Sequence, residues 1–145
     1  MAAQHFFSEI EQQQIIAAIQ QAERSTSGEI KVHVEKRCPT ETPLKRAEDL
    51  LCELGLRNTI LRNGVLFYLA YEDHQFAILG DEGIYAKVPS DFWLSTKDLL
   101  RSHFSKGEFV EGFCKAIEEA GRQLQHYFPS RVDGTNEIPD DISFG

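Results

Sequence analysis

The chain contains the sequence Gly64-Val65-Leu66-Phe67-Tyr68-Leu69-Ala70, in which apolar side chains follow one another without alternation. Such a run is typical of a central strand that is covered on both faces. The short polar segment 72–75 follows, and then a second apolar run at residues 76–79. Two apolar runs joined by a short polar turn predict an antiparallel hairpin, which forms the centre of the expected sheet.

A third strand and a helix precede this hairpin. Residues 30–35 alternate between apolar and polar side chains, which predicts a half-buried strand with one wetter face. Residues 44–56 have apolar side chains at helical spacing, and this predicts a helix that crosses back over the sheet. If the two strands joined by this helix are parallel, the three strands form a mixed sheet.

Further helices are expected on both sides of this central part. Ser8 and Glu11 form a capping-box signature at the start of a helix that ends before the break at residues 25–28. Ser90 is the expected N-cap of another helix, and a last one is expected from Glu108 to Tyr127. The predicted fold class is a single α/β domain over residues 1–128, with a small mixed sheet flanked by helices on both faces in the order α-β-α-β-β-α-α.

The composition changes after this domain. Residues 129–145 are rich in glycine, proline, asparagine and acidic residues, so we expect an acidic C-terminal tail. Its apolar residues Ile138, Ile142 and Phe144 are the ones expected to dock it on the domain. The tail is also the segment through which a basic partner or another protein would bind.

Length and charge limit the classes of function. A chain of 145 residues with 41% hydrophobic content has the usual size of one domain. The net charge of −8 argues against a nucleic-acid partner and favours cations or basic partners. No segment has the length and apolar character of a signal peptide or a membrane span, so we expect a soluble, cytoplasmic protein.

Three loops are expected to meet at one edge of the sheet. With the first two strands parallel and the third antiparallel, the two strand starts and the end of the third lie together. The loops are residues 27–29, 62–64 and 80–83, and they hold four glycines beside polar side chains. Glycines allow the backbone to approach a small ligand closely, so this edge is the main candidate site.

The polar side chains in these loops favour a hard cation. Glu29, Asp81, Glu82 and the amide oxygen of Asn63 are the oxygen ligands that Ca²⁺ and Mg²⁺ prefer. The alternative is that these are ordinary turn residues, with Glu29 paired to Arg62. Both interpretations remain open at this point.

Other chemistry has less support in the sequence. A second cluster of polar residues is expected at the opposite edge of the sheet, near Glu35, Arg37, Glu72 and Asp73, where a solvated hairpin turn is the simpler explanation. No thiol-phosphatase loop, P-loop or H-E-x-x-H motif occurs. The five histidines have no spacing typical of metal ligands and are interpreted as ordinary surface or core residues.

The order of four segments resembles a TPM domain across residues 5–128. These segments are residues 26–30, 63–66, 77–84 and 104–112, with Asn-Gly before the apolar strand and a glycine-rich loop after its hairpin partner. The resemblance implies a mixed sheet between helices and a divalent-metal site often occupied by calcium. It also implies the acid phosphatase activity suspected of plant thylakoid relatives.

The chain departs from this family pattern at two places. Arg62 stands where an aspartate commonly precedes Asn-Gly, and Asp73-His74 stands where Asp-Arg is common. Both departures argue against transferring the phosphatase activity. The chain also lacks the leader and the membrane helix of many relatives, so it resembles a stand-alone, bacterial, cytoplasmic version.

These observations lead to three hypotheses about function. The first is a non-catalytic or regulatory domain in which Asp81, Glu82, Glu29 and Asn63 hold Ca²⁺ or Mg²⁺. The second is a metal-dependent acid phosphatase acting on phosphomonoesters, with Arg62 contacting the phosphate. The third is a protein interaction module that uses residues 129–145.

Overall fold

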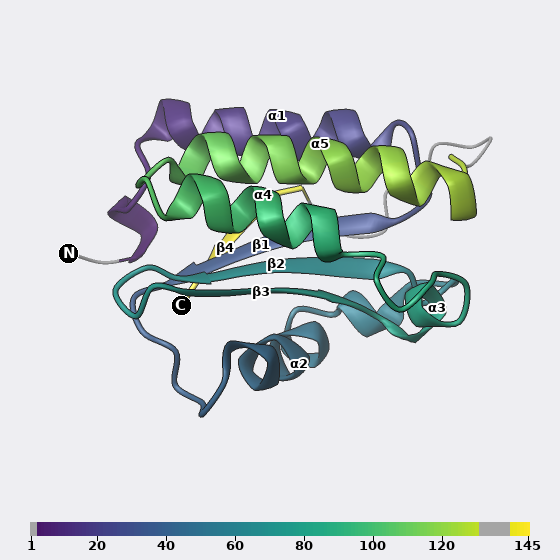
Figure 1. Ribbon diagram of the computed structural model, residues 1–145, viewed down its shortest axis with the longest axis horizontal. Helices are drawn as coiled ribbons and strands as arrows, with labels where there is room; N and C mark the ends of the chain where they lie inside the picture. Colours follow the sequence, from purple (N-terminus) through teal and green to yellow (C-terminus); the bar gives the residue numbers. More distant parts are fainter. Residues whose placement is uncertain (1–2, 131–139) are drawn as a thin grey trace.

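A four-stranded sheet lies between two layers of helices (Figure 1). The computed structural model describes residues 3–130 and 140–145. In chain order the elements are η1 (Ala3–His5), α1 (Glu9–Glu23), β1 (Glu29–Glu35), α2 (Pro43–Glu53), η2 (Leu56–Asn58), β2 (Gly64–Ala70), β3 (Gln75–Gly80), α3 (Glu82–Tyr85), α4 (Leu94–Phe104), α5 (Phe109–Tyr127) and β4 (Ile142–Phe144). Helices α1, α4 and α5 cover one face of the sheet, and α2 covers the other.

The strand order is β3-β2-β1-β4. Strands β1 and β2 are parallel, and β2 and β3 form an antiparallel hairpin, so the predicted mixed sheet is confirmed. Strand β4 is an addition to the predicted order, since it pairs in parallel with the outer side of β1. Ile142 and Phe144 of the tail lie in this strand, whereas Ile138 lies outside the described residues.

The core consists of two clusters separated by the sheet. One face of β1 and β2, including Val32 and Phe67, packs against α1 and α5. The other face of β2, including Leu66 and Tyr68, packs against α2. All seven residues of β2 are buried, which confirms the prediction of a central strand covered on both sides.

The helix signals agree with the structure to different degrees. Ser8 Oγ accepts the amide of Glu11 at 3.1 Å, and the Glu11 carboxylate accepts the Ser8 amide at 2.9 Å, so the capping box is present. The helix expected to follow Ser90 starts only at Leu94. Trp93 lies immediately before that start and is buried as a member of the larger core cluster.

The prediction of a solvent-exposed face for β1 is wrong, because all seven residues of this strand are buried. Strand β4 covers the outer side of β1, and the polar side chains find partners there. Lys31 binds the carboxylate of Asp141, and Nδ1 of His33 lies 2.8 Å from Oγ of Ser143. The sequence pattern shows alternating polarity, but it does not show that the tail returns to cover the polar half.

Helices long and apolar enough to cross a membrane do not occur in residues 3–130 or 140–145.

Candidate functional site

The three glycine loops meet at one edge of the sheet. The amide of Glu29 donates to the backbone oxygen of Asn63 at 3.4 Å, and the amide of Asp81 donates to that of Gly64 at 2.9 Å. Gly83 packs directly against the loop that precedes β2, because a Cβ at this position would lie only 2.0 Å from the backbone oxygen of Leu61. Glycine is therefore required here, since any side chain would push the loops apart.

Asp81 lies at the centre of this edge, but its partners are cations of the chain itself. Its carboxylate is fully buried and accepts Nη1 of Arg57 at 2.8 Å. Nε and Nη2 of Arg62 donate to the two carboxylate oxygens at 2.6 and 3.0 Å. The hydrogen bond to Asp81 raises the pKa of Arg62. Two guanidinium groups already balance this carboxylate, and their charges repel an added cation.

Glu82 and Asn63 do not join Asp81 in a ligand shell. The Glu82 side chain is 74% exposed, and its carboxylate lies 3.6 Å from Nη1 of Arg62. The Asn63 side chain is buried, and its Nδ2 donates to Oγ of Ser27 at 3.2 Å. Its Oδ1 is also buried and accepts no hydrogen bond within the part of the chain that the structure describes.

Glu29 lies in a second group of side chains at the same edge. Glu23 at the end of α1 and Asp140 just before β4 each place a carboxylate oxygen beside it. One ligand atom from each of these three residues lies within 4.8 Å of the other two. The amide of Ile30 donates to Oε2 of Glu23 at 2.7 Å, which fixes the end of α1 against the start of β1.

This group consists of three carboxyl side chains that are buried or half-buried. Burial raises the pKa of Glu23 to about 10, and a hydrogen bond with Asp140 and the charge of Glu29 act in the same direction. Glu23 therefore holds a proton at neutral pH, chiefly because burial disfavours its charged form. A divalent cation is able to take the place of that proton.

The sequence interpretation missed two members of this group. The sequence pattern gives no role to Glu23, which falls within the helix expected before residues 25–28, and it places Asp140 in the acidic tail. The signal available was the pair Asp140-Asp141 directly before an apolar residue that docks the tail. A tail docked through that residue places its acidic pair beside the domain.

The polar residues at the opposite edge bind one another. Nε and Nη2 of Arg46 donate to the two carboxylate oxygens of Glu35 at 2.9 and 3.1 Å, and the hydroxyl of Tyr68 donates to Glu35 as well. Glu72 accepts Nε of Arg37 at 3.4 Å, and Asp73 accepts the amide of Cys38 at 2.7 Å. These contacts join α2, β1 and the hairpin turn, so a structural role accounts for them.

Comparison with known proteins gives a consistent result. The family model described as the TPM domain matches residues 1–123. The solution structure of the BA42 protein from the psychrophilic bacterium Bizionia argentinensis is 42% identical, with a TM-score of 0.90 over 97% of this chain and 96% of that one. The N-terminal domain of the cg2496 protein from Corynebacterium glutamicum is 16% identical and shares the fold alone. Its TM-score is 0.66 over 93% of this chain and 82% of that one. No curated protein sequence matches the chain.

Proposed function

The chain belongs to the TPM domain family, and from this premise we propose that it binds a divalent cation, Ca²⁺ or Mg²⁺, at the starts of its parallel strands. The ligands are Glu29, Glu23 and Asp140. The observation that supports this most strongly is the convergence of three carboxylates from distant parts of the sequence, with ligand atoms within 4.8 Å of one another. Oxygen-only ligand sets of this kind suit hard cations.

The cation would have a structural consequence. Its three ligands come from the end of α1, the start of β1 and Asp140, which lies two positions before the docked strand β4. Binding therefore tightens the contact between the C-terminal residues and the rest of the domain. Because a cation that binds only the folded state stabilises it, we propose a regulatory role for this site rather than a catalytic one.

The predicted ligands contribute unequally to this proposal. Glu29 is retained, and Asn63 lies next to it through the hydrogen bond between their backbones. Asp81 and Glu82 are replaced by Glu23 and Asp140, because Arg57 and Arg62 neutralise Asp81. The same pairing engages the guanidinium group that the phosphatase hypothesis assigns to a phosphate, so we do not extend the proposal to phosphomonoesters.

An NMR titration of the full chain with Ca²⁺ and then Mg²⁺ tests the proposal. Saturable shifts are expected at the amides of Gly28, Ile30 and Asp140. Glu29→Gln should weaken binding about tenfold to hundredfold, since it removes a charged ligand. Glu82→Gln is the matched control, because it removes a predicted ligand at the same edge that has no place in the proposed site. Equal losses in the two variants, or no shifts at millimolar cation, would contradict the proposal.

A further inference from the structure

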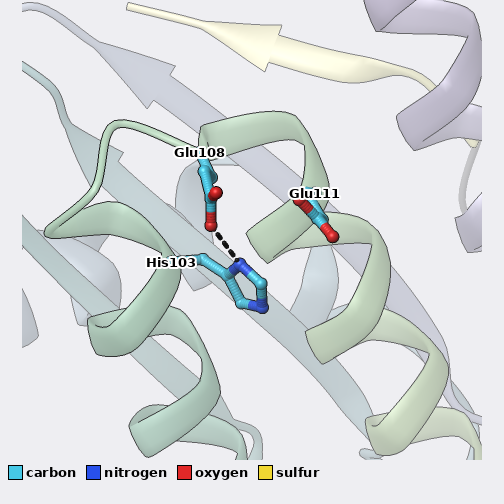
Figure 2. A group of neighbouring side chains, drawn as sticks. All are labelled: His103, Glu108 and Glu111. Atoms are coloured by element: carbon cyan, nitrogen blue, oxygen red, sulfur yellow. Dashed lines mark hydrogen bonds and ion pairs between the residues drawn. The ribbon is translucent and has the colours of Figure 1, made fainter.

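The turn between α4 and α5 brings together a second set of metal-ligating side chains (Figure 2). His103 lies in the last turn of α4, Glu108 immediately precedes α5, and Glu111 lies in the first turn of α5. Nδ1 of His103 is 2.8 Å from Oε1 of Glu108. Each of the three residues offers one ligand atom, and these atoms lie within 4.8 Å of one another.

The backbone of this turn fixes the histidine. Gly107 has a φ of 77°, which reverses the chain, and the amide of Glu108 donates to the backbone oxygen of His103 at 2.9 Å. Gly112 lies so close that a Cβ there would be 2.9 Å from both Cβ of His103 and the ring of Phe104. The His103 side chain is only 14% exposed, so its orientation is set before any ligand arrives.

The two glutamates are placed by the start of α5. Glu108 occupies the N-cap position, yet its side chain makes no capping hydrogen bond and faces the imidazole instead (Figure 2). Glu111 follows three residues later, and residues three apart lie on the same side of a helix. A simple ion pair between His103 and Glu108 explains two of these positions. Glu111 adds a second carboxylate to this pair, since it has a ligand atom within 4.8 Å of the imidazole while it also pairs with Lys115 at 3.1 Å.

We propose that His103, Glu108 and Glu111 form a separate binding site for a transition-metal ion such as Zn²⁺. One imidazole nitrogen and two carboxylate oxygens suit Zn²⁺, whereas sites for Ca²⁺ and Mg²⁺ use oxygen ligands alone. Three protein ligands leave at least one coordination position for water or for a group on another molecule. The positive charge of the ion offsets the repulsion between the two carboxylates.

This site is independent of the cation site proposed above. The turn between α4 and α5 lies at one end of the molecule, and the start of β1 lies at the other end, near α3 (Figure 1). The ligand types differ as well, since Glu23, Glu29 and Asp140 provide oxygen only. The two sites can therefore be separated by position and by metal.

The experiment is an NMR titration of the full chain with Zn²⁺ in the presence of excess Mg²⁺. The chain has five histidines, so the readout must be specific for residues. We expect saturable shifts at the amides of residues 103–112 and a large shift of one ring nitrogen of His103. Excess Mg²⁺ should not reverse them, because an imidazole ligand discriminates against Mg²⁺.

Two variants of α5 complete the test. Glu111→Gln removes a proposed ligand, while Glu118→Gln is a matched control on the same helix. Both glutamates pair with a basic residue four positions later, Lys115 at 3.1 Å and Arg122 at 2.9 Å. Zinc affinity should fall about tenfold to hundredfold in the first variant and stay unchanged in the second. The proposal is overturned if both variants lose affinity equally, or if Zn²⁺ leaves the signals of residues 103–112 unmoved.

Discussion

Asp81 and Glu29 lie at the same edge of the sheet, and both are buried, but among the residues that the structure describes they lie beside side chains of opposite charge. Asp81 faces two arginines, whereas Glu29 faces two other acidic residues. A carboxylate among cations stabilises the chain without a ligand, and a carboxylate among anions is stabilised by adding one. Burial alone therefore does not identify a metal ligand, because the charge of the neighbours decides which role is available.

The largest effect on stability is expected when the ion pairs of Asp81 with Arg57 and Arg62 are removed. Asp81→Ala should lower the free energy of unfolding by about 2 to 4 kcal/mol, because it leaves Arg57 and Arg62 without their buried acceptor and removes the cap of α3. The loss should be the same with and without Ca²⁺. Urea unfolding measures it, and Glu82→Ala should change stability by no more than about 0.5 kcal/mol. Loss of Ca²⁺ binding in a folded Asp81→Ala variant would place Asp81 among the ligands.

Cation binding by the carboxylate group around Glu29, in contrast, should depend on pH. The pKa of Glu23 is about 10 in the folded protein, so cation binding near neutral pH releases one proton. Affinity for Ca²⁺ should therefore rise about tenfold per pH unit, or about hundredfold from pH 6.5 to 8.5. Calorimetry at several pH values measures this slope, and Glu23→Gln should weaken binding and remove the slope. A flat profile in the wild-type protein would argue against Glu23 as a ligand.

The same group sets the stability of the cation-free protein. The folded-state pKa of Glu23 lies above its ordinary value of 4.5, so the folded state binds the proton more tightly than the unfolded state. The resulting stabilisation is fully present below about pH 4.5 and is lost as the pH rises toward 10. Saturating Ca²⁺ should offset that loss, which thermal unfolding at pH 6.5 and 8.5 can show.

Asp140 and Asp141 of the tail differ in the same way, since one lies beside acidic side chains and the other beside a basic one. Asp140 faces Glu23 and Glu29, whereas Asp141 binds Lys31, whose side chain is only 8% exposed. Asp141→Asn should lower the free energy of unfolding by about 1 to 2 kcal/mol and leave Ca²⁺ affinity unchanged, since a buried lysine loses its charged partner. Asp140→Asn should weaken Ca²⁺ binding about tenfold to hundredfold, because it removes a charged ligand. Reversed results for the two variants would mean that the tail docks in another register.

The sequence predicted more of the fold than of the site. The apolar run of β2, the hairpin and the Ser8 capping box depend on neighbouring residues, so their patterns are visible in the chain itself. The convergence of the three loops also followed, because the parallel pairing of β1 and β2 determines it. The side chains that surround each carboxylate could not be predicted from the sequence. Arg57 reaches Asp81 from a separate turn, and Asp140 reaches Glu29 from more than a hundred residues away.

The smallest expected effect has the opposite sign to the first. Without a cation at pH 8.5, Glu29→Gln should raise the free energy of unfolding by about 0.5 kcal/mol, because a neutral amide replaces one of the mutually repelling, partly desolvated carboxylates. With Ca²⁺ at about a hundred times the wild-type dissociation constant, the wild-type protein gains about 2.7 kcal/mol. The variant, which binds about tenfold to hundredfold more weakly, gains only about 0.4 to 1.4 kcal/mol, so the order of stability reverses. Urea unfolding with and without Ca²⁺ measures both values. If Glu29→Gln is less stable than the wild type under both conditions and by the same amount, Glu29 supports the fold as Asp81 does.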